Sequence, residues 1–195
     1  MPVKTLLDFQ LTGSFNLIKN AVSGMTDDEW VARPHPAANL LGFTLWHCLR
    51  TIDWTVNGIA ANRRELADQP EWSDVKPSGS MFGAGLTREE ADGVARGIGR
   101  SRLLEYEGEL RSQVFSWFRP LREEDFDRTV DLKGQGLATR DHLQPASWRE
   151  IEDLDGLPLW QFLARPAVSH TRVHYGEVMA QLEAVRAQAG EPLKG

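Results

Sequence analysis

Apolar residues recur at helical spacing along several segments of this 195-residue chain. In residues 3–22 they step by three and four positions, which places them on one face of a helix. These residues are Leu7, Leu11, Phe15, Ile18 and Val22. The glycine that follows at position 24 is typical of a helix end. The sequence therefore predicts an amphipathic helix over residues 3–22.

Residues 40–66 carry apolar side chains on two faces of a second predicted helix. Leu41, Leu45 and Leu49 begin one stripe, whereas Phe43 and His47 lie on nearly the opposite side at 100° per residue. A helix that is apolar on two sides is buried on two sides. We therefore expect His47 to face another helix, a cleft or a second subunit.

Two further helices are predicted over residues 87–118 and 158–189. The first begins with Thr87 and Glu90 in the spacing of a capping box. The second contains a proline, Pro166, that is expected to kink or restart it. The following residues of that helix are predicted to share one side: Leu159, Leu163, His170, Val173, His174, Glu177 and Val178.

The connections between these helices are long. The run TDDE at residues 26–29 predicts a short capped helix, and residues 68–85 read as a loop rich in Pro, Ser and Gly. The segment TVDLKGQGLAT suggests a small hairpin with its turn at Gly134 and Gly136. The predicted fold is therefore all-α: a single domain over residues 1–195, built as an antiparallel four-helix bundle with long connecting loops.

The charge of the chain narrows the function classes. Its net charge is -6, and no run is rich in Lys or Arg, which argues against a nucleic-acid partner. No stretch approaches the roughly 20 apolar residues that cross a bilayer, and the N-terminus lacks a signal pattern. With one cysteine, no disulfide can form within the chain. We expect a cytoplasmic protein that binds a small molecule, with no membrane or nucleic-acid partner.

Two histidines four positions apart, His170 and His174, raise the prospect of a metal site. Residues at this spacing project from one side of a helix and can bind the same ion. The alternative is a polar helix boundary in which both rings bond carbonyls or water. A third ligand must come from elsewhere, and the spacing leaves three candidates open: His35, His47 and His142.

Other polar residues near these histidines have simpler interpretations. Glu177 shares the side of His170 and is expected to orient a ligand or accept a proton, unless it lies at a solvated helix end. Asp53 is expected to be a surface carboxylate or to pair with Arg50, which itself is predicted to be an ordinary surface charge. Cys48 points away from its neighbour His47 and is expected to pack as a small buried hydrophobe.

Four segments together resemble one family. They are MTDDEWVARP, FTLWHCLRTIDW, LREEDFDRTVDL and VSHTRVHYGEV, and in this order they resemble the DinB-like metalloenzymes. The resemblance implies a four-helix bundle whose single divalent metal is held by His47, His170 and His174. Many members have Arg-Gly-Gln after the second histidine of the HxxxH pair, whereas this chain has Tyr175-Gly176-Glu177. That departure puts any one activity of the family in doubt for this chain.

The resemblance also implies a reaction class. Relatives include transferases and isomerases that use bacillithiol or mycothiol, so we expect a metal-dependent enzyme that joins a low-molecular-weight thiol to a small electrophile, with hydrolysis as the closest variant. Imidazole ligands suit Zn, Ni and Fe alike. A homodimer is a further expectation. The competing hypothesis is a stress-response protein that binds metal or a small ligand without turnover.

Overall fold

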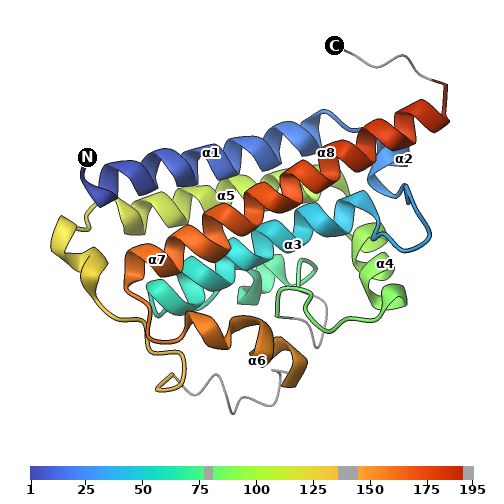
Figure 1. The fold of residues 1–195 in the computed structure, drawn as a ribbon. Coiled ribbons are helices and arrows are strands. Elements are labelled where there is room, and N and C mark those ends of the chain that lie inside the picture. The colour runs from blue at the N-terminus through green and yellow to red at the C-terminus, as the bar shows by residue number, and fades with distance from the viewer. Residues whose placement is uncertain (77–80, 136–144, 191–195) are drawn as a thin grey trace.

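The structure, a computed structural model, describes residues 1–76, 81–135 and 145–190. Its framework is a bundle of four long helices: α1 (Val3–Ser23), α3 (Leu41–Asp53), α5 (Arg100–Phe118) and α8 (His170–Gln188). Figure 1 shows α1 and α8 running in one direction and α3 and α5 in the other. The predicted all-α bundle is therefore confirmed. No helix in the described ranges has the length and apolarity required to cross a bilayer.

The apolar stripe predicted for α1 forms one side of the bundle core. All five of its residues are buried in the structure. After Ser23 the chain turns into the short helix α2 (Asp27–Trp30). Thr26 and Glu29 form the predicted capping box, because each side chain accepts a hydrogen bond from the backbone N–H of the other. The sequence thus predicted both the helix and its successor.

Helix α3 is buried on both faces, as its pattern indicated. It continues as a π-helical segment, Trp54–Ala60, and ends at Ala60 rather than at the predicted Leu66. Two residues after this end, Asn62 adopts a left-handed φ of 48°. Other elements of the same chain cover both faces, so the two-sided pattern does not require a second subunit. The homodimer remains a prediction.

The helix predicted over residues 87–118 is in fact two helices, α4 (Arg88–Gly97) and α5. Between them Ile98 has extended backbone, and its side chain is buried. The carbonyls of Ala95 and Ile98 both accept a hydrogen bond from the indole of Trp30. Glycines on either side of Ile98 weaken the helix at this point, and the contact with Trp30 fixes the break.

The last predicted helix is interrupted at its proline. It consists of α7 (Leu159–Leu163), a π-helical segment (Ala164–Ser169) and then α8. Pro166 lacks the N–H that would continue the α-helical hydrogen bonds, and the wider turn accommodates it. The predicted irregularity is confirmed, and α8 begins directly after it at His170.

The inner face of α8 differs from the predicted one. Its buried positions are Thr171, Val178 and Leu182, whereas Val173 is 69% exposed. The prediction that Val173 faces the core was wrong, because it lies on the opposite side of the helix from Thr171. His170 and His174 lie at the edge of the buried face, next to α3.

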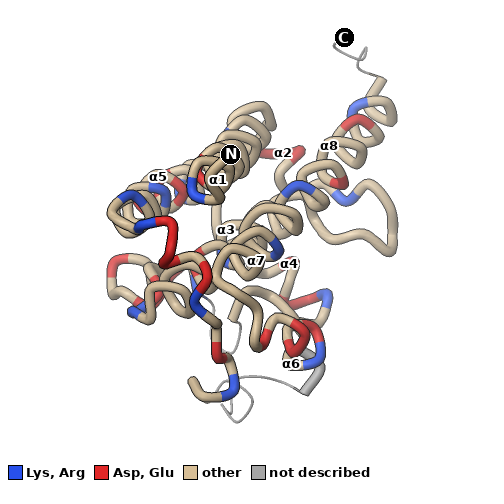
Figure 2. Tube along the Cα trace, turned by 60° about the vertical axis from the view of Figure 1, so that its left-hand side comes forward, with Lys and Arg blue, Asp and Glu red and all other residues tan. Residues whose placement is uncertain are grey.

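The segment between α5 and α7 contains a helix that the sequence pattern did not reveal, α6 (Pro145–Ile151). Figure 1 shows it below α3, along the side of the bundle, and Figure 2 shows acidic and basic residues interspersed around it. The expected hairpin falls partly on residues 136–139, outside the described residues. In its described part, Val130 N–H donates instead to the Leu157 carbonyl at 2.8 Å.

Candidate metal centre

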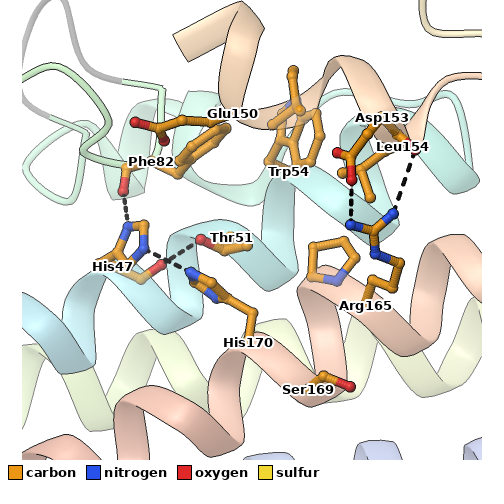
Figure 3. Close-up of a pocket in the computed structure, with 12 residues that line it drawn as sticks. His47, Thr51, Trp54, Phe82, Glu150, Asp153, Leu154, Arg165, Ser169 and His170 are labelled. Carbon is orange, nitrogen blue, oxygen red and sulfur yellow. Dashed lines mark hydrogen bonds and ion pairs between the residues drawn. The ribbon is translucent and has the colours of Figure 1, made fainter. Parts of the chain in front are cut away.

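The structure brings together three histidines from two helices. His47 projects from the middle of α3, and His170 and His174 project from the first two turns of α8. The Nε2 atoms of His47 and His170 lie 3.0 Å apart, and the ring centroids of His47 and His174 are 5.2 Å apart. Figure 3 shows the rings of His47 and His170 turned toward each other. Of the other two candidates for the third ligand, His35 is not part of this cluster, and His142 lies outside the described residues.

The spacing of the cluster fits a single cation. One nitrogen from each of the three rings lies within 4.8 Å of the other two. Three nitrogens bound at about 2.1 Å to one tetrahedral ion are separated by about 3.4 Å. Small side-chain rotations therefore suffice to place all three at coordination distance.

A backbone carbonyl fixes the proton of His47. Its Nδ1 is hydrogen-bonded to the carbonyl oxygen of Phe82, which can only accept. Nδ1 must therefore carry the proton, and the lone pair of the neutral ring lies on Nε2. That nitrogen points toward His170 (Figure 3). Such an outward N–H bond is typical of metal-binding histidines.

Glu177 holds His174 in the same manner. Its carboxylate lies 2.9 Å from Nδ1 of His174 and also accepts a hydrogen bond from Gln181. A proton on Nδ1 leaves the lone pair of His174 on Nε2. Glu177 therefore contacts a histidine of the candidate site, as one of the two interpretations of its sequence position expected.

Burial keeps two of the imidazoles neutral. Loss of hydration lowers the pKa of His47 to about 4, against a smaller raising effect of its bond to Phe82. Loss of hydration, together with the neighbouring His47 and His174, lowers the pKa of His170 to about 3. At neutral pH both rings are therefore in the form that binds metal ions. Nδ1 of His170 is buried and has no hydrogen-bond partner among the described residues.

A cavity of about 280 Å³ opens beside His47 and His170. Much of its wall is apolar and includes Trp54, Phe82 and Leu154. An ion pair between Arg165 and Asp153 also lines it, as Figure 3 shows. This side of the cluster suits a small molecule with an apolar group.

A second cavity, of about 240 Å³, adjoins the other side of the cluster. It is lined by His47, His174 and Glu177, and its wall includes polar side chains such as Asn39. Glu150 of α6 lines both cavities. Sequence reasoning missed Glu150 because it lies in a region without helical period, where no spacing related it to the histidines.

The other polar candidates lie away from the cavities. Arg50 is fully buried, which contradicts its prediction as a surface charge, and it pairs with the equally buried Asp53 at 2.7 Å. Pairing with Arg50 was one of the two expectations for Asp53. Cys48 is buried as predicted, and burial raises the pKa of its thiol, which keeps it protonated and unreactive.

The contact between Glu177 and His174 leads to a first prediction. Glu177→Gln removes the anionic acceptor but keeps the shape, and is expected to weaken metal binding about tenfold. Competition with a chelating dye measures this affinity. Glu183→Gln, farther along α8, is the matched control and should bind as the wild type does. Equal affinities for all three proteins would show that Glu177 does not support the site.

Comparisons with known proteins agree with this architecture. The sequence profile of the DinB superfamily matches residues 10–178. A crystal structure of a conserved protein from Enterococcus faecalis is similar, with a TM-score of 0.68 and 17% identity over 96% of this chain and 99% of that one. At this identity the likeness concerns the fold alone. No curated protein matches the sequence.

Proposed function

The chain belongs to the DinB superfamily, and from this premise we propose that it is a metal-dependent enzyme whose His47, His170 and His174 bind one divalent cation. The observation that carries the proposal is the convergence of three imidazoles from two helices. A lone proton between Nε2 of His47 and Nε2 of His170 would account for that pair but not for the position of His174 beside it. A cation would bind one nitrogen from each of the three rings at once.

The ligand set indicates an open site. Three histidines are the protein ligands of catalytic rather than structural zinc, and Ni or Fe would accept them equally. Such a cation, when bound, stabilises the deprotonated form of a water or thiol beside it. The cavities on both sides of the cluster leave room for such a molecule to reach it.

We propose thiol-dependent transfer or isomerisation as the reaction class. Two cavities share His47, so two reactants can approach the site from different sides. The apolar cavity suits a small electrophile, and the more polar one suits a low-molecular-weight thiol such as mycothiol or bacillithiol, which also agrees with a cytoplasmic location. Hydrolysis would need only one of the two cavities.

The proton of the thiol needs an acceptor. Two carboxylates lie near the cluster, and we assign one of them to proton acceptance and the other to orienting a metal ligand. Glu177 bonds His174 and Gln181, so its role is to orient a ligand. Glu150 faces both cavities, and we assign it the role of proton acceptor.

The test is turnover of a chromogenic electrophile, such as a chlorodinitrobenzene, in the presence of small thiols. Turnover by protein loaded with Zn, Ni or Fe is expected to require both the metal and the thiol. Glu150→Gln should lower the rate about 100-fold without loss of metal. Glu152→Gln, two residues along and outside both cavities, should retain the wild-type rate.

The outcomes separate the two function classes. Turnover that disappears with a chelator supports the enzyme. Stoichiometric metal without turnover with any of several thiols would favour the alternative, a protein that binds metal or a ligand in a stress response. A wild-type rate for Glu150→Gln would remove that residue from the mechanism.

A further inference from the structure

A buried arginine connects the elements that surround His47. The guanidinium of Arg50 is fully buried and donates to four oxygens on different parts of the chain. Nη1 bonds Asp53 at 2.7 Å and the Tyr106 hydroxyl at 2.9 Å. Nη2 bonds Glu65 at 2.6 Å and the Met81 carbonyl at 2.8 Å. Arg50 therefore ties helix α3 to α5 and to two irregular segments.

The bond to Met81 bears directly on the candidate metal centre. The next carbonyl along the chain, that of Phe82, is the one that bonds Nδ1 of His47. His47 and Arg50 are three residues apart, so they project from the same side of α3. One turn of this helix thus holds two successive carbonyls of a segment that has no regular secondary structure of its own.

Gly83 brings the same segment close to the helix. Its φ is 104°, a conformation that side-chain-bearing residues rarely adopt. A Cβ at this position would lie 2.9 Å from Cζ3 of Trp46 and 3.0 Å from Cζ of Phe43, both on α3. Any larger residue would therefore push the Phe82 carbonyl away from His47.

We propose that Arg50 and Gly83 are positioning residues for His47. Arg50 acts through the Met81 backbone and Gly83 through close packing, and together they hold the Phe82 carbonyl at Nδ1. The proton of His47 is thereby kept on Nδ1, and Nε2 is directed at His170 and His174. The inference rests on the proposed function for its consequence, metal affinity, but the tautomer of His47 can be measured without metal.

The first measurement is the tautomer of His47 in metal-free protein near pH 7.5, by NMR of the ¹⁵N-labelled imidazoles. The wild type is expected to carry the proton on Nδ1. In Arg50→Lys, which loses the planar fork, and in Gly83→Ala, this single tautomer is expected to give way to a mixture. Arg63→Gln is the matched control, since Arg63 bonds Asn57 and Gln113 but not residues 81–83.

The second measurement is binding of Co²⁺, followed by its visible absorption. Arg50→Lys and Gly83→Ala are expected to bind about tenfold more weakly than the wild type and to show an altered band, whereas Arg63→Gln should match the wild type. Folded Arg50→Met should bind Co²⁺ more weakly still, so that lysine at this position restores part of the affinity that methionine loses.

The results distinguish this inference from the proposed function. A wild type that binds no Co²⁺ would reject the metal site, and the NMR result would still decide the role of Arg50 and Gly83. A folded Arg50→Lys and Gly83→Ala that both keep the Nδ1 tautomer would overturn the inference. If these variants lose stability but keep the tautomer and the Co²⁺ affinity of the wild type, Arg50 and Gly83 have a structural role only.

Discussion

Replacing Asp53 by alanine is expected to lower the free energy of unfolding by about 3–5 kcal/mol. The reason is that Asp53 is fully buried and is, with Glu65, one of two carboxylates that pair with the buried Arg50. Its carboxylate accepts five hydrogen bonds, from Arg50, Tyr106, Asn57 and the backbone N–H groups of Leu66 and Ala67. Alanine leaves these donors without a partner in a site that water does not reach.

Urea unfolding followed by circular dichroism measures this loss. Asp74→Ala is the control, because Asp74 forms an ion pair with Arg102 at the surface; its effect should stay below about 1 kcal/mol. Since domains are stable by only about 5–15 kcal/mol, the expected difference is large. Similar losses for the two variants would contradict the assignment of Asp53 to a buried network.

The second large effect is expected at the histidines. His170→Ala should weaken binding of Zn²⁺ about 100-fold or more, because two imidazoles cannot hold the ion as three do. Nε2 of His170 lies 3.0 Å from Nε2 of His47, and the rings of His170 and His174 lie 4.5 Å apart. Competition with a chelating dye gives the affinity.

His35→Ala provides the control for this experiment. His35 lies in an exposed loop, where its Nδ1 accepts a hydrogen bond from Ala37 N–H, and its loss should leave the affinity unchanged. His47→Ala should behave as His170→Ala does, although the two residues are 123 positions apart in the chain. An affinity in His170→Ala close to that of the wild type would reject the three-histidine site.

The helices of this fold are largely predictable from its sequence, whereas the form of their interruptions is not. The apolar stripe of α1 is predictable because its residues recur at helical spacing. The break at Ile98 depends on Trp30, which is 68 residues away and donates to its carbonyl. Such a contact leaves no mark in the local pattern. Pro166 was visible as an interruption, but its result, a π-helical turn, depends on the packing around it.

The candidate site was likewise predictable where local spacing indicates it, and not where it depends on distant parts of the chain. The spacing of His170 and His174 indicated two ligands, whereas the choice of His47 over His35 and His142 came from family resemblance. Arg50 looked like a surface charge, because three of its four partners in the folded chain lie in other segments. The Phe82 carbonyl could not be predicted at all, since every residue has one and only the fold selects it.

X-ray absorption at the zinc edge of the loaded wild-type protein tests the central claim most directly. The account predicts one ion per chain with three imidazole nitrogens at about 2.0–2.1 Å, together with one oxygen ligand from solvent. His47→Ala should show one imidazole fewer in the fitted shell. A wild-type shell made of oxygen ligands with at most one imidazole would contradict the account.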